Sequence, residues 1–201
     1  MNRRAELSAD RLSGLGFEAQ PAGWRRALAE GDPVVRADAA FLLGEQPDDD
    51  SASTTREVLV TALRDIEARI RVEAAYALVR RGLDVSARAV LRQELDGTFF
   101  ADAPLRAARY LAHLGDARGY PRVIEALASD LPSVRMEAIA VLPDFQPLVG
   151  GGSPSGDTVP VDPVSALRGA LSDPEPMLRA DAQAALDRLT KAEQRPDQGS
   201  R

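Results

Sequence analysis

The chain has 201 residues, of which 44% are hydrophobic, so it can bury a core and is not disordered throughout. Its formal net charge of −6 argues against an unaided nucleic-acid binder or anionic-membrane binder, since both need a cationic surface. With no Cys and one His, His113, it also lacks the residues of a disulfide scaffold, a thiol enzyme or a Cys/His metal site.

The first residues predict a helix around Arg4–Ser13 that caps the fold. Two arginines open the chain, but no apolar stretch of a signal peptide follows them. No window approaches the roughly 18 consecutive apolar residues of a membrane span. We therefore expect a cytoplasmic protein that does not enter a membrane.

A motif then recurs along the chain: an aliphatic residue, an arginine, two variable positions and a pair of small residues, with Leu or Val further on. This self-similarity predicts a repeat protein. Shorter amphipathic stretches alternate with the motif, so each unit is a helix–turn–helix. The first helices are expected at 22–30, 55–65, 85–95, 120–129 and 163–172, and the second helices at 32–45, 66–82, 102–116, 130–142 and 173–189.

Helix starts and loops follow from the Pro, Gly and Asp residues. Asp32-Pro33, Asp162-Pro163 and Asp173-Pro174 each predict a capping carboxylate before a proline in the first turn. Gly, Pro and Ser mark residues 146–162 as an inserted loop. The prediction is a single domain over residues 1–189, followed by a disordered tail at 190–201.

The motif D-P-x-[VL]-R-x-[DE]-A-A, together with LGDARGYPRVIEAL at 114–127, resembles the short HEAT-like repeats of phycobilisome lyases and many bacterial proteins. The resemblance covers roughly residues 21–189. It implies an all-α fold: a right-handed α-solenoid of about five helix–turn–helix repeats, whose second helices line the concave face. Stacking is expected on physical grounds as well, because one helix pair cannot bury its own apolar face.

The motif arginine is interpreted as structural, because an Asp or Glu precedes it by four to six residues in every repeat. In the family such pairs form a ladder between successive turns, and a guanidinium can bond two partners at once. The ladder residues are Arg36, Arg71, Arg135 and Arg179.

The third repeat can be aligned in two ways. Alignment on Arg106 keeps the spacing but places Arg109 at a core alanine position. Alignment on the Ala107–Ala108 pair moves Arg106 two places along. We prefer the second alignment, because an unpaired buried arginine is costly.

Two repeat positions on the second helices are the candidate binding surface. The position two residues after the ladder arginine is acidic except in the third repeat, and it is expected to face outward: Asp38, Glu73, Arg106, Glu137 and Asp181. Three residues further on come Phe41, Tyr76 and Arg109, residue types that are enriched at binding hot spots. The plainer alternatives are a solvated acidic face and aromatic residues that fill gaps in an Ala-rich core. Trp24 is expected in the core.

Catalytic and metal-binding motifs are missing from the sequence. His113 has no second His or Cys to act with, no G-x-S-x-G motif is present, and the glycine run 150–152 has no lysine for a phosphate loop. Asp48–Asp50 lacks the Gly and the terminal Glu of an EF-hand loop. We expect no catalytic residue, no metal and no cofactor.

The sequence therefore predicts a non-enzymatic scaffold or adaptor that holds a protein partner with a basic patch on its concave face. Two alternatives stay open. The family resemblance also suits a bilin or tetrapyrrole lyase-type or chaperone subunit, and the acidic charge suits a small inhibitor or immunity-type protein.

Overall fold

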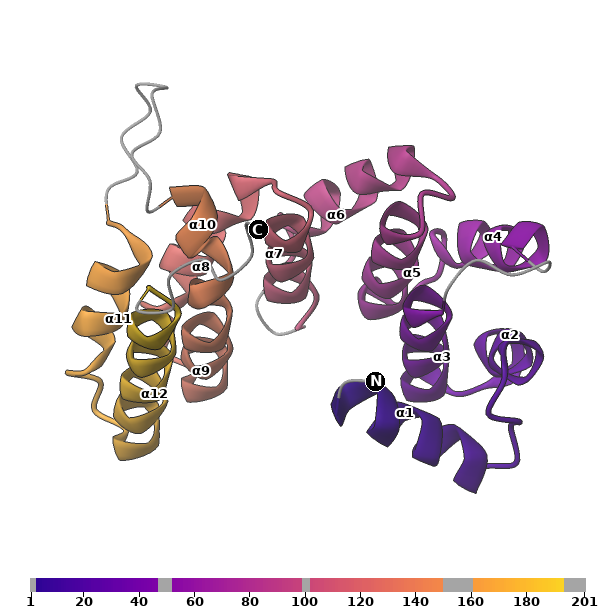
Figure 1. The fold of residues 1–201 in the computed structure, drawn as a ribbon, viewed down its shortest axis with the longest axis horizontal. Helices are drawn as coiled ribbons and strands as arrows, with labels where there is room; N and C mark the ends of the chain where they lie inside the picture. The colour runs from indigo at the N-terminus through magenta and orange to yellow at the C-terminus, as the bar shows by residue number, and fades with distance from the viewer. Residues whose placement is uncertain (1–2, 47–51, 99–101, 150–160, 194–201) are drawn as a thin grey trace, which may run out of the picture. The chain divides into compact units, whose positions relative to one another are not determined.

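The computed structural model describes residues 3–46, 52–98, 102–149 and 161–193, and every regular element in those ranges is a helix (Figure 1). The prediction of an all-α fold built from consecutive helix pairs is confirmed. The chain divides into two compact units, unit 1 from Met1 to Ala103 and unit 2 from Pro104 to Arg201.

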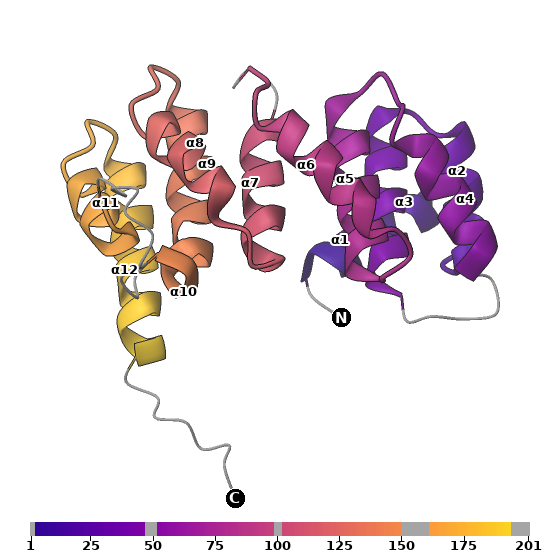
Figure 2. The same cartoon turned by 90° about the horizontal axis from the view of Figure 1, so that it is seen from above.

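Unit 1 holds an N-terminal helix, two complete helix pairs and the first half of a third pair. α1 spans Arg3–Gly14. The pairs are α2 (Pro21–Glu30) with α3 (Pro33–Glu45) and α4 (Ala52–Ala62) with α5 (Ala68–Arg80), followed by the 3-10 turn η1 (Val85–Ala87) and α6 (Arg88–Glu94). α3 packs on both α2 and α5, and α1 packs on α3 (Figures 1 and 2).

Unit 2 continues the pattern with the second helix of the third pair and two further pairs. Its elements are α7 (Ala103–His113), η2 (Ala117–Gly119), α8 (Tyr120–Ala126), α9 (Pro132–Val141), η3 (Leu142–Phe145), α10 (Gln146–Val149), α11 (Pro163–Ala170) and α12 (Pro176–Glu193). α9 packs on α8 and α12, and α11 packs on α12.

The division between the units falls in the third repeat. When α7 is aligned on its alanine pair, Pro104 stands where the other second helices carry the ladder arginine. The third repeat therefore has no ladder arginine, and this is the repeat in which unit 1 ends and unit 2 begins. The repeat pattern does not predict this division, because it treats all five pairs alike.

Two of the three predicted Asp-Pro helix starts are confirmed. The carboxylate of Asp32 accepts hydrogen bonds from the amides of Val34 and Val35, and that of Asp162 accepts one from Ser165. The third is wrong: α12 begins at Pro176, and Asp173 lies in the turn before it, where its carboxylate accepts a bond from the Glu175 amide.

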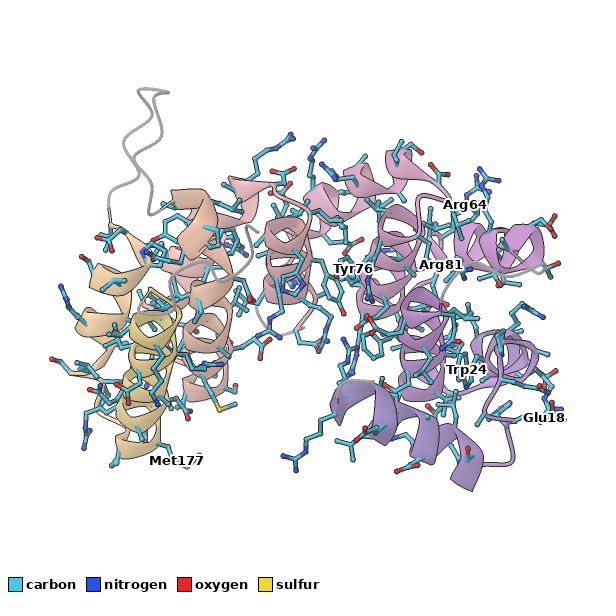
Figure 3. All side chains as sticks on the ribbon, viewed as in Figure 1. Glu18, Trp24, Arg64, Tyr76, Arg81 and Met177 are labelled. Carbon is cyan, nitrogen blue, oxygen red and sulfur yellow. The ribbon has the colours of Figure 1, made fainter. Side chains whose placement is uncertain are left out.

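The core consists of Ala, Leu and Val from the second helices, with few aromatic rings. Small residues let these helices approach closely: a Cβ added to Gly44 on α3 would lie 2.8 Å from the Cβ of Ala77 on α5. Trp24, on α2, is buried as predicted (Figure 3). Tyr120 is buried too; its hydroxyl donates to the carbonyl of Val161, and burial raises its pKa.

Several predicted boundaries are corrected. The expected loop at 146–162 begins with a helical turn, α10, and ends where α11 starts at Pro163, while residues 150–160 lie outside the described ranges. The expected tail begins too early, because α12 continues through Glu193. Residues 194–201 and the Asp48–Asp50 run also lie outside the described ranges. Within the described ranges, none of the helices combines the length and the hydropathy that a membrane span requires.

Candidate functional site

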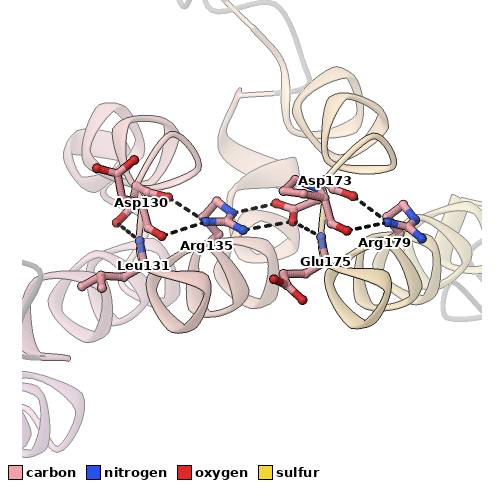
Figure 4. A network of polar contacts seen from close by, with 8 residues as sticks. Asp130, Leu131, Arg135, Asp173, Glu175 and Arg179 are labelled. Atoms are coloured by element: carbon pink, nitrogen blue, oxygen red, sulfur yellow. Dashed lines mark hydrogen bonds and ion pairs between the residues drawn. The ribbon is translucent and has the colours of Figure 1, made fainter.

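A ladder arginine lies near the start of four second helices, α3, α5, α9 and α12, and two of these arginines bond both to the turn before the helix and to a carboxylate further along. The guanidinium of Arg135 donates to both carboxylate oxygens of Asp173, at 2.7 and 3.1 Å, and to the carbonyls of Ser129 and Asp130 (Figure 4). Arg71 does the same with Glu94, at 2.6 and 2.9 Å, and with two turn carbonyls. These arginines therefore serve the fold by tying elements together.

The other two ladder arginines make only part of these contacts. Arg36 pairs with Asp65 in the following repeat. Arg179, in the final repeat, donates to the carbonyls of Asp173 and Pro174 (Figure 4). The sequence interpretation placed the acid of each pair before its own arginine; Asp65 and Asp173 instead bond the arginine of the preceding repeat through their side chains.

Hydrogen-bonded ion pairs in the ladder shift the pKa values of the residues that form them. The hydrogen bond from Arg135 is the main reason that the pKa of Asp173 lies below its usual value. The hydrogen bond to Glu94 raises the pKa of Arg71 in the same way. Both groups are therefore held in their charged forms.

The third repeat follows the alignment on its alanine pair. Ala107 and Ala108 are fully buried, whereas Arg106 and Arg109 are half-buried, which matches Ala74, Ala75 and Tyr76 on α5. The helix exits match as well, because Gly82 after α5 and Gly115 after α7 both have positive φ, 66° and 74°. A positive φ suits glycine because it has no Cβ.

The two candidate positions recur on the second helices of each unit, and we call the side of those helices that carries them the second-helix face. It comprises Asp38, Phe41, Glu73, Tyr76, Arg106, Arg109, Glu137, Ala140, Asp181 and Ala184. Burial differs sharply along it. Asp38, Phe41 and Glu73 are buried, Tyr76, Arg106, Arg109 and Glu137 are half-buried, and Ala140, Asp181 and Ala184 are exposed. The expectation that this position faces outward is therefore wrong for Asp38 and Glu73.

In unit 1 this face is covered by α1. Arg11 pairs with Asp38 at 2.6 Å, and Arg4 pairs with Glu73 at 2.5 Å. The Arg4 guanidinium also lies over the Phe41 ring, 3.7 Å from its centroid, a cation–π contact. Buried carboxylates need such partners, because an unpaired charge away from water is strongly disfavoured.

The apolar part of this contact is small. α1 buries Ala5, Ser8 and Leu12, which lie along one side of the helix. Of these, Leu12 contributes most, about 2 kcal/mol for an aliphatic side chain removed from water. Leu7 and Leu15 stay largely exposed. Charged contacts therefore make up much of the attachment of α1.

In unit 2 the same face is open among the described residues. On α9 and α12 it presents Glu137, Ala140, Asp181 and Ala184, and the exposed Met136 and Met177 lie beside these positions. Met177 is 70% exposed (Figure 3). It precedes Asp181 by one helical turn, so the two side chains are neighbours. Exposed methionines next to carboxylates form a mixed apolar and acidic surface.

Arg109 connects α7 to this surface. Its guanidinium lies 3.3 Å from a carboxylate oxygen of Glu137 and 3.4 Å from one of Asp144. His113, which is exposed as its sequence context suggests, lies 3.5 Å from Asp144. Arg109 and His113 therefore both contact acids of unit 2.

Sequence reasoning missed Arg4 and Arg11. The signal was present, because the two arginines are seven residues apart and flank the apolar side of the predicted capping helix. It also missed Glu94 as the partner of Arg71. No group of three or more His, Cys, Asp or Glu side chains that could hold a metal ion occurs in the part of the chain that the structure describes.

The comparisons with known proteins find no family model that matches this chain. They find no matching curated protein either. Among solved structures, an engineered protein is 21% identical, with 94% of this chain and 87% of the other covered and a TM-score of 0.48. A designed armadillo repeat protein in complex with the peptide (KR)4 is 15% identical, with 93% and 90% covered and a TM-score of 0.49.

Human deoxyhypusine hydroxylase is 17% identical, with 91% of this chain and 88% of the other covered and a TM-score of 0.33. Because all three TM-scores are below 0.5, the fold of this chain is established by its own helices and their packing, not by these likenesses. The chain is an all-α protein of tandem helix pairs, with an arginine ladder at the start of its second helices.

Proposed function

We propose that the chain is a non-enzymatic scaffold that binds a protein partner on the open second-helix face of unit 2. The partner presents a basic segment with an apolar side. Asp181, together with Glu137 beside its pair with Arg109, orients the cations of this segment, and Met136 and Met177 contact its apolar side chains. The resemblance to HEAT-like repeats implies that the second helices line the concave side of a solenoid.

One observation carries the proposal: in unit 1 the same repeat positions already hold an arginine-bearing helix. Asp38 and Glu73 bind the arginines of α1, and Glu137 and Asp181 occupy the equivalent positions on α9 and α12. The carboxylates of unit 2 therefore stand where a cationic helix is bound in unit 1.

The composition of the open face suits this role. Methionine is flexible and polarisable, so it adapts to different apolar partners. The exposed alanines let a partner backbone approach closely. Arg106 and Arg109 add positive charge at one end of the face and fix the direction in which a charged segment can lie. Carboxylates that face solvent speed association with a cationic partner, and salt weakens this effect.

The test is capture of partners from a native lysate by the full chain, followed by quantitative mass spectrometry. The E137K/D181K variant reverses both charges on the face. The matched control E30K/E57K makes the same change of net charge at exposed positions on α2 and α4, outside the face. We expect a partner that is retained by the wild type and the control and is lost at least tenfold with E137K/D181K.

Retention must also fall as the salt concentration rises, because exposed charges are screened. If the same proteins are retained equally by E137K/D181K and by the wild type, the open face is not the binding surface and the proposal fails.

A further inference from the structure

We infer that the covered face of unit 1 is a second partner site and that α1 is the intramolecular ligand that occupies it. The partner that this site accepts is an amphipathic helix with two arginines seven residues apart. The inference concerns unit 1 alone, so it stands whether or not unit 2 binds a partner.

The covered groups are those of a recognition surface. α1 lies over two carboxylates and one aromatic ring, Asp38, Glu73 and Phe41, and contacts them through two arginines. A helix that only closes an apolar stack needs no buried acids beneath it. By contrast, α3 buries nine residues, most of them Ala, Leu and Val, against its neighbours, whereas α1 buries three.

The spacing of the arginines matches the spacing of the helices. Seven residues of α-helix rise about 10.5 Å, and packed helices lie about 8–10 Å apart. α3 and α5 are packed on each other, and each contributes one carboxylate from the same repeat position. Two arginines one heptad apart on a crossing helix can therefore reach both acids at once.

The contacts also define the rest of the ligand. Arg4 combines an ion pair with Glu73 and stacking on Phe41, which a planar guanidinium performs better than a lysine ammonium. Small residues stand one and four positions after it, Ala5 and Ser8, and an aliphatic residue follows Arg11. The pattern is Arg-small-x-x-small-x-x-Arg-aliphatic.

α1 is joined to α2 by residues 15–20, which have their own anchor. Arg26 on α2 donates to the carbonyl of Gly16 at 3.0 Å and lies over the Phe17 ring at 5.2 Å. Gly16 has a positive φ of 83°, at the point where the chain turns away from α1. Release of α1 therefore requires the loss of contacts before Gly16 and leaves the anchor on α2 in place.

The experiment measures binding of a fluorescein-labelled, acetylated peptide with the sequence of residues 3–15 to the full chain by fluorescence anisotropy. R4A/R11A weakens the chain's own α1. The matched control R3A/R64A removes two exposed arginines for which the structure gives no ion pair. D38N/E73Q in the R4A/R11A background removes both charges of the site with little change in shape.

We expect R4A/R11A to bind the peptide at least tenfold more tightly than the wild type, and R3A/R64A to bind it like the wild type. Addition of D38N/E73Q must remove the gain, whereas addition of E137K/D181K must preserve it, which separates this site from the one in unit 2. If R4A/R11A binds no more tightly than the wild type, α1 is a fixed part of the core and the inference is wrong.

Amide hydrogen exchange of the unsubstituted chain is a second test, and it does not depend on how any variant folds. Because α1 opens separately, its amides must exchange at least tenfold faster than those of α3. Equal protection of α1 and α3 would mean that α1 leaves only when the whole unit unfolds, which would also overturn the inference.

Discussion

The second-helix face is covered by a helix in unit 1 and open in unit 2. In unit 1 its acids are buried beneath α1 and paired with Arg4 and Arg11, and in unit 2 the equivalent acids are half-buried or exposed. The repeat position and the charge are the same. The difference is whether a cationic helix lies on the face.

The partners of the buried acids in unit 1, Arg4 and Arg11, come from the capping helix α1. Asp38 and Glu73 are as buried as core alanines, yet they stand at the position that is open in unit 2. Ladder residues differ, because their partners come from the same stack of helices. The ladder ties helices together in both units, and the recognition role of the second-helix face is our proposal.

The largest expected effect is on the ladder, which both units share. Arg71→Ala removes two bonds to the buried carboxylate of Glu94 and two to turn carbonyls, so we expect a loss of about 3 kcal/mol in the free energy of unfolding. Arg179→Ala removes bonds to carbonyls only and should cost about 1 kcal/mol. Urea denaturation measures both. Equal losses would show that the carboxylate adds nothing to the ladder.

Next come the acids of the face itself. Glu73→Ala removes a fully buried carboxylate and its pair with Arg4, and should lower the free energy of unfolding by about 2 kcal/mol. Asp181→Ala, at the equivalent exposed position, should change it by less than about 0.5 kcal/mol. The same urea titration compares the two. A loss at Asp181 as large as that at Glu73 would erase the distinction between a covered and an open face.

A smaller effect concerns pH and separates the ladder from the face. The pKa of Asp173 is lowered by its bond with Arg135, so this carboxylate stabilises the fold fully above its unfolded value of about 3.9. That contribution is lost as the pH falls through the lower pKa of the folded state. Between about pH 4 and pH 2 the wild type should therefore lose more stability than Asp173→Asn.

The urea midpoints of the two chains at several pH values test this. The pKa values of Asp84 and Asp162 are also lowered, chiefly by hydrogen bonds from serine, but both residues are present in both chains. Parallel pH curves for the wild type and Asp173→Asn would contradict the assigned role of the pair.

The smallest effect is that of salt on α1. The Arg11 side chain is 48% exposed, so its pair with Asp38 is partly screened by ions. An increase from about 0.05 M to about 0.5 M sodium chloride should speed amide exchange in α1 by up to about threefold relative to α3. Exchange that slows with salt would show that apolar contacts, not the arginines, hold α1 in place.

Much of the fold could be predicted because the same helical pattern recurs in each repeat of the sequence. The predicted helices agree with the observed ones within a few residues in most cases, since Ala and Leu recur at helical spacing and Asp-Pro marks two of the starts. The recurrence of one arginine also led to the ladder, even though Glu94 was not identified as a partner.

The cover over the face could not be predicted, because an amphipathic pattern shows that a helix has a buried side but not what lies beneath it. The residues of α1 alone do not predict that Arg4 pairs with Glu73, which is 69 positions away in the sequence. Asp173 was misjudged for a related reason: Asp before Pro is typical of a helix start, and a pairing with Arg135 in the preceding repeat depends on tertiary packing.

Carboxyl footprinting of the full chain tests the central comparison most directly. Solvent-accessible acids are coupled to an amine with a carbodiimide, and the extent of modification at each site is read by mass spectrometry. The account predicts rapid modification of Asp181, slow modification of Asp38 and Glu73, and a rise at these two sites in R4A/R11A to rates near that of Asp181. If Asp38 and Glu73 react as fast as Asp181 in the wild type, or stay protected in R4A/R11A, α1 is not the cover that distinguishes the two units.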